Sequence, residues 1–121
     1  MPTTSFPEKH RHFIQLLGKL QKELPGPMSA FTQLSQKATA DGALNKKTKE
    51  LIALGIGIHA RCEGCISFHV HDALKAGATR NEILETIGVA IEMGGGPSAM
   101  YGCEALEALD QFEESLKLKA A

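Results

Sequence analysis

The chain has 121 residues, of which 43% are hydrophobic, and its formal net charge is −1. The length suits one domain over residues 1–121, and the near-neutral charge argues against nucleic acid or an anionic membrane surface as a partner. The first nine residues hold no apolar run and the longest apolar stretch, 51–58, is too short to span a bilayer, so we expect a cytoplasmic protein.

Helix formers dominate the composition. Ala and Leu occur 15 and 14 times, whereas Val occurs only twice and aromatic residues make up 5% of the chain. Strands favour the opposite balance, since β-branched and aromatic side chains pack best on a pleated surface. We therefore expect an all-α fold, and the Gly, Pro and capping residues along the chain divide it into about six helices.

The first two expected helices occupy the first third of the chain. Ser5 and Glu8 have the spacing of a capping box, and apolar residues follow at helical intervals as far as Leu24. Pro25-Gly26 ends this helix, and a second helix runs from there to the break at Asp41-Gly42. The apolar face expected for the second helix consists of Met28, Phe31, Leu34 and Ala38.

A third helix is expected from a cap at Asn45 to about Ala60. Its middle, 51–58, is apolar on every side, which is typical of a helix buried all round at the centre of a domain or an oligomer. Self-association would supply the cover that so short a chain lacks. The same run is also compatible with a buried strand, because periodicity alone does not separate the two.

Three further helices are expected after residue 61. The fourth starts near Cys62 and ends at Gly77, and the fifth opens with a capping box formed by Thr79 and Glu82. Gly94–Gly96 forms a loop before a last helix that reaches about Leu118. The residues expected to face inward are Ile66, Val70, Ala73 and Leu74 on the fourth helix, and Ile83, Leu84, Ile87 and Ile91 on the fifth.

The sequence Cys62-x-x-Cys65-x-x-x-His69 carries the clearest chemistry. On a helix these three residues share one face, so the thiols lie within disulfide reach and the imidazole lies one turn beyond Cys65. A helix start and a neighbouring base both favour the reactive thiolate. The pattern therefore predicts a redox-active dithiol. Two other interpretations stay open: a zinc site with His71 or Cys103 as a distant fourth ligand, or inert buried thiols.

Several other residues are less specific. Glu50 either approaches His69, if the third helix folds back on the fourth, or is a solvated residue near the start of its helix. His59 either lines the pocket of the cysteines or only ends its helix. We expect His71 to face solvent or an interface and Cys103 to be a packed core thiol. His10 and His12 are expected on the surface.

Taken together, these residues resemble a known family. Glu50, eleven residues, and then Cys62-x-x-Cys65-x-x-x-His69 is similar to the signature of alkylhydroperoxidase D (AhpD)-like proteins within the carboxymuconolactone decarboxylase family. The resemblance covers roughly residues 45–101. The flanking segments that agree with the family are 51–54, 71–79, 82–85 and 95–97.

The resemblance implies a helical bundle that assembles into homo-oligomers, either trimers or hexamers. It also implies a thiol-dependent, peroxiredoxin-type peroxidase without metal or organic cofactor, which takes a peroxide substrate and a dithiol protein reductant. By the same resemblance Cys65 is the peroxidatic thiol, Cys62 the resolving thiol, and Glu50 with His69 the proton relay. One departure is Gly64, where the best-studied form of the site has another histidine.

The sequence leaves two other functions open. The scaffold is shared with carboxymuconolactone decarboxylases, so a lyase acting on a carboxylated lactone is one alternative, with Arg61 as the obvious nearby cation. A non-enzymatic oligomeric module that senses redox state or binds metal is another. A thioredoxin-like fold, with a strand at 51–58, is disfavoured by the scarcity of β-branched runs elsewhere.

Overall fold

The computed structural model describes residues 5–120, and their side chains as far as residue 117. Its elements are α1 (Phe6–Glu23), α2 (Pro25–Ala38), α3 (Lys46–His59), α4 (Glu63–Lys75), α5 (Arg80–Gly94) and α6 (Gly96–Ala120). No strand occurs among residues 5–120, so the all-α prediction is confirmed and the alternative of a strand at 51–58 is wrong. The thioredoxin-like alternative, which required that strand, is therefore also wrong.

The helix ends lie where the local sequence signals place them. Ser5 and Asn45 cap α1 and α3 by accepting a hydrogen bond from the backbone N–H three residues ahead. At the start of α5, Thr79 and Glu82 satisfy each other's backbone N–H groups in a full capping box. Gly77 follows α4 with a φ of 97°, a conformation that glycine adopts without steric cost. The loop expected at 94–96 is shorter than predicted, since only Gly95 lies outside α5 and α6.

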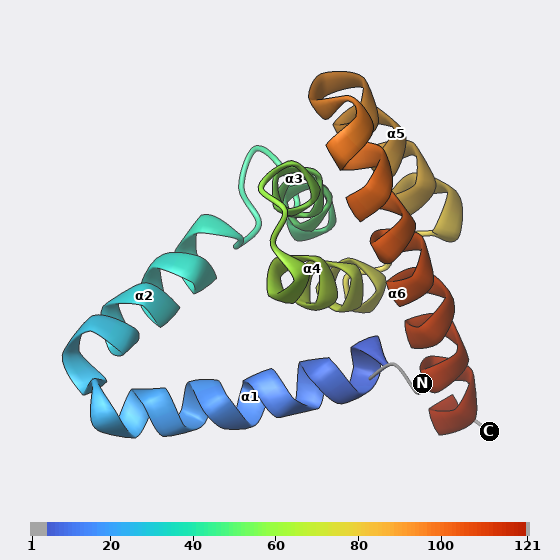
Figure 1. The fold of residues 1–121 in the computed structure, drawn as a ribbon. Helices are drawn as coiled ribbons and strands as arrows, with labels where there is room; N and C mark the ends of the chain where they lie inside the picture. Colours follow the sequence, from blue (N-terminus) through green and yellow to red (C-terminus); the bar gives the residue numbers. More distant parts are fainter. Residues whose placement is uncertain (1–4, 121) are drawn as a thin grey trace.

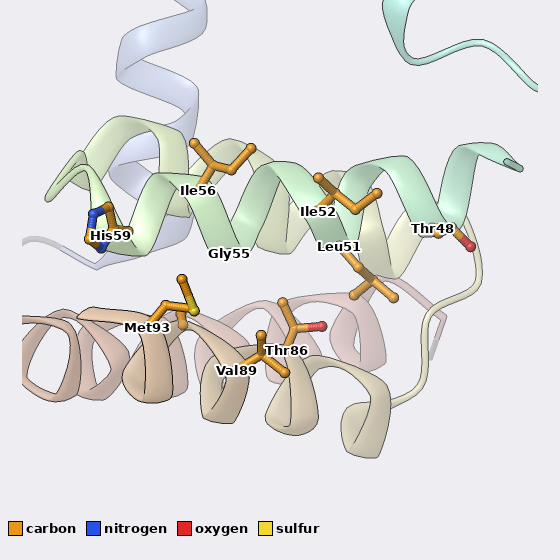
Figure 2. A pocket seen from close by; sticks show the side chains of 10 residues that line it. Thr48, Leu51, Ile52, Gly55, Ile56, His59, Thr86, Val89 and Met93 are labelled. Carbon is orange, nitrogen blue, oxygen red and sulfur yellow. The ribbon is translucent and has the colours of Figure 1, made fainter. Parts of the chain in front are cut away.

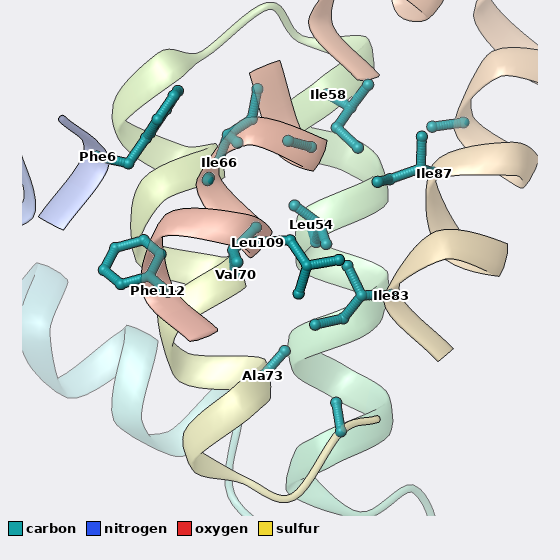
Figure 3. Close-up of a cluster of buried hydrophobic side chains, with 14 residues drawn as sticks. Phe6, Leu54, Ile58, Ile66, Val70, Ala73, Ile83, Ile87, Leu109 and Phe112 are labelled. Atoms are coloured by element: carbon teal, nitrogen blue, oxygen red, sulfur yellow. The ribbon is translucent and has the colours of Figure 1, made fainter. Parts of the chain in front are cut away.

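The hydrophobic core lies where α3, α4, α5 and α6 meet (Figure 3). Each of these helices contributes a side chain with no exposed surface: Leu54, Ile66, Ile83 and Leu109. On α4 the predicted inner face is confirmed for Ile66, Val70 and Ala73, which are fully buried, and Leu74 packs against the core only partly buried. On α5 the prediction is wrong for Leu84, which is 37% exposed; the buried residues follow the spacing 83, 87 and 90, and Leu84 lies beside that stripe.

Helix α3 is not buried all round within one chain. Leu54, Gly57 and Ile58 are buried, but Ile52 is 48% exposed and Ile56 is 63% exposed. The reason is that α4, α5 and α6 cover only one side of α3. The prediction of a fully surrounded helix is therefore wrong for the single chain.

Helices α1 and α2 form an arm that extends from this core (Figure 1). The arm is anchored at the start of α1, where Phe6 and His10 are buried against α4 and α6. Helix α2 returns toward α3 and has no buried residue; Phe31 and Leu34 on its expected inner face are 60% and 64% exposed. Among the described residues, no helix is both long and apolar enough to cross a membrane.

Candidate functional site

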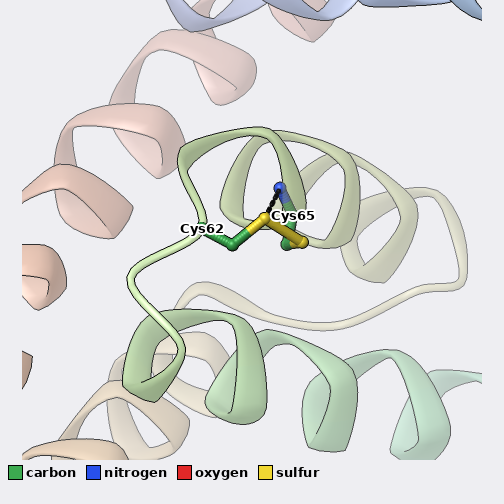
Figure 4. The surroundings of a disulfide bond; sticks show 2 residues. All are labelled: Cys62 and Cys65. Carbon is green, nitrogen blue, oxygen red and sulfur yellow. Dashed lines mark hydrogen bonds between the residues drawn. A yellow bond between two sulfur atoms is a disulfide. The ribbon is translucent and has the colours of Figure 1, made fainter.

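The two cysteines meet at the first turn of α4 (Figure 4). Cys62 is the N-cap and Cys65 is the third residue of the helix, and their sulfur atoms form a disulfide with the Cα atoms 5.2 Å apart. The Cys65 N–H also donates a hydrogen bond to Cys62 Sγ at 3.2 Å. The unpaired amide groups of a helix start favour a negative charge, so the same position suits a thiolate when the bond is open.

A tight connection from α3 holds the first turn of α4 in place. The chain turns at Arg61, whose φ of 58° lies in the left-handed region, and the Cys62 N–H then donates to the carbonyl of Gly57 at 3.1 Å. The two helices lie close together at Gly57, where an added Cβ would lie 3.1 Å from the Cβ of Cys65. Gly57 therefore permits the close approach of α3 to the disulfide.

The packing of α3 against α4 brings Glu50 and His69 together, as the first of the two interpretations of Glu50 expected. His69 Nδ1 lies 3.2 Å from Glu50 Oε2, and the carboxylate is only 2% exposed. The second carboxylate oxygen lies 3.8 Å from the Nζ of Lys46, whose side chain is half exposed. The alternative of a solvated Glu50 is wrong, because the packing of α3 against α4 buries it.

The disulfide and the imidazole open onto a pocket of about 610 Å³ between the arm and α4. The arm supplies most of its apolar wall and a row of small polar groups. Gly64 lies beside the arm, since a Cβ there would be 3.7 Å from the ring of Phe13. The residues that line the pocket are Phe13, Leu17, Gly18, Gln21, Met28, Phe31, Thr32, Ser35, Gln36, Cys62, Gly64, Cys65, Phe68, His69 and Asp72.

Asp72, which the sequence pattern did not single out, lines the same pocket. Its carboxylate oxygen lies within 4.8 Å of ligand atoms of both Glu50 and His69, and it accepts a hydrogen bond from His71 Nδ1 at 2.9 Å. Burial raises the pKa of Asp72, but the His71 hydrogen bond and the charges of His71, His69 and His10 outweigh it and leave the pKa below its usual value. The i, i+3 spacing from His69 could have revealed it.

Two predicted placements need correction. His10 is 8% exposed and stacks on His71 with ring centroids 4.2 Å apart, because α1 packs against α4; it is not a surface residue. His71, which was expected to face solvent or an interface, is the partner of His10 in this stack, and its side chain is 27% exposed. Cys103 is an exposed thiol on α6 rather than a core residue. The expected surface position of His12 is confirmed.

His59 lies in a different pocket from the cysteines (Figure 2). This second pocket, of about 490 Å³, lies between α3 and α5 and is lined almost wholly by apolar groups. His59 is at one end of it and Thr48 near the other. The exposed Ile52 and Ile56 belong to its rim, so the uncovered side of α3 and this pocket are parts of one apolar surface.

Comparison with known proteins agrees with the fold and identifies the family. The family model described as "Carboxymuconolactone decarboxylase family" matches residues 25–108. The chain is 41% identical to an uncharacterised protein of Cupriavidus necator over 107 residues, which cover 88% of this chain and 91% of the relative. A further uncharacterised protein, from the cox locus of Paracoccus denitrificans, is 43% identical over 84 residues, covering 69% and 76%.

Solved structures give the same result. A carboxymuconolactone decarboxylase family protein from Legionella pneumophila is 50% identical, with a TM-score of 0.85, covering 88% of this chain and 96% of that one. A Thermotoga maritima member, whose description suggests a part in the antioxidative response, is 26% identical with a TM-score of 0.81, covering 91% and 97%. The fold is thus shared with solved members of this family, and this chain belongs to the carboxymuconolactone decarboxylase family.

Proposed function

We propose that this protein is a thiol-dependent peroxidase of the AhpD-like type, with Cys65 as the peroxidatic thiol. The observation that carries the proposal is the shared pocket. Both cysteines and His69 line it, and the Glu50 carboxylate contacts the Nδ1 atom of His69. A carboxylate behind an imidazole orients the ring and stabilises its protonated form. The antioxidative description of the Thermotoga maritima relative supports the same chemistry.

The first half of the cycle uses the thiolate of Cys65. His69, oriented by Glu50, accepts the thiol proton, and the sulfur attacks the outer oxygen of a peroxide. The S–O bond forms as the O–O bond breaks, so the sulfur is oxidised to a sulfenic acid and the peroxide is reduced. The proton held on His69 goes to the departing alkoxide or hydroxide, which leaves as an alcohol or water.

The second half of the cycle closes and reopens the disulfide. The Cys62 thiol attacks the sulfur of the Cys65 sulfenic acid, the S–O bond breaks, and water leaves. A dithiol protein then reduces the disulfide by exchange and becomes a disulfide itself. This second substrate requires a reducing compartment, so the proposal includes a cytoplasmic location.

The lyase alternative receives less support from the pocket. A carboxylated lactone needs cationic groups to hold its carboxylates, and no Lys or Arg is among the described residues that line the pocket. Arg61, the cation considered from the sequence, is exposed and does not line it. The paired cysteines would also have no part in a decarboxylation.

Stopped-flow consumption of an organic hydroperoxide or hydrogen peroxide, with dithiothreitol as reductant, tests the proposal. We expect Cys65→Ser to abolish turnover, and Cys62→Ser, treated with peroxide after the dithiothreitol has been removed, to accumulate a sulfenic acid that dimedone traps at Cys65. Cys103→Ser is the matched control, since it removes a thiol that does not line the pocket. Undiminished consumption by Cys65→Ser, or a dimedone adduct on Cys62 alone, would contradict the assignment.

A further inference from the structure

Two carboxylates and one imidazole converge at the pocket, where His69 and Asp72 line the wall and Glu50 lies behind them. Ligand atoms of Glu50, His69 and Asp72 all lie within 4.8 Å of one another. Glu50 comes from α3, whereas His69 and Asp72 lie three residues apart on one face of α4. Their exposed fractions rise from 2% for Glu50 through 27% for His69 to 37% for Asp72, so the group is closed on the α3 side and open toward the pocket.

We propose that these three residues bind a divalent transition-metal ion of the zinc class. Zinc takes nitrogen and oxygen ligands at about 2.0–2.2 Å, and three protein ligands with a fourth position open is a common arrangement. Mg²⁺ and Ca²⁺ are excluded by ligand type, since they prefer an all-oxygen shell with more ligands. The open position here would face the pocket that His69 and Asp72 line.

The observed geometry is close to what such an ion requires. Two ligands on a tetrahedral zinc ion are separated by about 3.3 Å, and His69 Nδ1 is already 3.2 Å from Glu50 Oε2. The ligand atom of Asp72 lies within 4.8 Å of both, so at most a small movement of its side chain would complete the site. The Asp72 side chain is more than a third exposed, and its movement toward the ion would cost the hydrogen bond to His71.

The charges also favour a dication. Glu50 is a buried carboxylate whose partners are one imidazole and the half-exposed Lys46. A buried carboxylate is costly without compensation, and Asp72 adds a second negative charge nearby. A bound Zn²⁺ would balance the two carboxylates, and Lys46 can swing into solvent.

A rival group shares one of the three residues. His10, His71 and Asp72 also have ligand atoms within 4.8 Å of one another. The rings of His10 and His71 are stacked, however, with 29° between their planes and 4.2 Å between their centroids. Lone pairs lie in the ring planes, so those of stacked rings run side by side and do not converge on one ion. This geometry favours the group around His69.

The ion would be regulatory rather than catalytic. Zinc on His69 takes the position of its hydrogen bond to Glu50, so it stops His69 from moving a proton; this consequence rests on the proposed function. Metal binding itself does not rest on it. A protein that binds zinc without consuming peroxide keeps the inference, and a peroxidase that binds no zinc rejects it.

Isothermal titration of the oxidised full-length protein with zinc chloride, at neutral pH in a non-chelating buffer, tests the inference. The closed disulfide keeps Cys62 and Cys65 from acting as thiolate ligands. We expect one ion per chain, and at least about tenfold weaker binding in each of Glu50→Gln, His69→Gln and Asp72→Asn. Circular dichroism of each variant checks that it is folded.

Two further variants decide between the groups. Glu85→Gln, the same change as Glu50→Gln at an exposed position of α5, should bind as the unaltered protein does. His71→Gln should also leave the affinity within about threefold. Absence of binding, unchanged binding in Glu50→Gln, or a loss in His71→Gln that Glu50→Gln does not share would each overturn the proposal.

Discussion

Glu50 of α3 and His69 of α4 meet at 3.2 Å, and this contact joins a buried carboxylate to the imidazole that lines the pocket. The relationship has an energetic consequence. Truncating His69 leaves Glu50 without that partner, and a buried acceptor that loses its hydrogen bond costs about 1–3 kcal/mol. The contact therefore contributes to stability as well as to the proposed chemistry.

A double-mutant cycle should show this coupling. We expect His69→Ala to lower the free energy of unfolding by about 1–3 kcal/mol, because it leaves Glu50 unpaired. The same substitution in a Glu50→Leu background should cost less, since no carboxylate remains to be stranded. Chemical denaturation of the four oxidised proteins measures the difference. Equal costs in both backgrounds would show that the two side chains are not coupled.

Gly57 should tolerate a methyl group less well than an exposed glycine does. A Cβ there would meet the Cβ of Cys65 at 3.1 Å, whereas a Cβ on Gly18 has no atom within 4 Å apart from its own helix. Gly18→Ala should raise the free energy of unfolding by about 0.5–1 kcal/mol, the usual helix gain. Gly57→Ala should lower it by about 1 kcal/mol, because overpacking exceeds that gain.

Denaturation of both alanine variants with the disulfide closed gives the comparison. The same amino-acid change in two helices controls for propensity, so the difference reports the contact between α3 and α4. A stabilised Gly57→Ala would mean that α4 yields to the added methyl group at little cost.

Asp72 should make folding stability depend on acid pH. Its pKa in the folded protein lies below the ordinary value of 3.8, despite burial, because of the His71 hydrogen bond and the nearby histidine charges. The carboxylate therefore stabilises the fold fully above about pH 4, and this contribution is lost as the pH falls through the folded-state pKa. The Asp72→Asn variant has no carboxyl group to titrate at this position.

Unfolding curves between pH 2.5 and pH 6 measure this contribution. The stability advantage of the unaltered protein over Asp72→Asn should be constant near pH 5–6 and should shrink below about pH 4. An advantage that grows as the pH falls would reverse the sign of the linkage.

The arm should mediate self-association. Leu34 is 64% exposed on α2, and the uncovered Ile56 on α3 is 63% exposed. Exposed apolar surface of this extent is typical of an interface between protein chains. We expect a mass that is a multiple of the 13.0 kDa chain, a trimer or a hexamer, and a smaller species for Leu34→Glu.

Light scattering coupled to size-exclusion chromatography measures the mass. Gln33→Glu introduces the same charge on the neighbouring exposed residue and should leave the assembly unchanged. A monomeric unaltered protein, or equal dissociation by both variants, would contradict a specific interface through Leu34.

The sequence predicted what depends on neighbouring residues along the chain. Helix ends at Ser5, Asn45 and Thr79 follow from caps whose partners lie three residues away. The inner face of α4 and the pairing of Cys62 with Cys65 follow from helical spacing, because positions three and four apart share a face. These features need no knowledge of the rest of the fold.

Only the tertiary structure decided what depends on contacts between distant segments. The burial of Glu50 against His69 required α3 to fold back on α4, and the apolar wall beside the cysteines came from Phe13 and Phe31 in the arm. The same packing buried His10, which local polarity had placed on the surface. Local sequence fixes a helix and its faces, but which face meets which is a property of how whole helices pack, and that choice assembled the pocket.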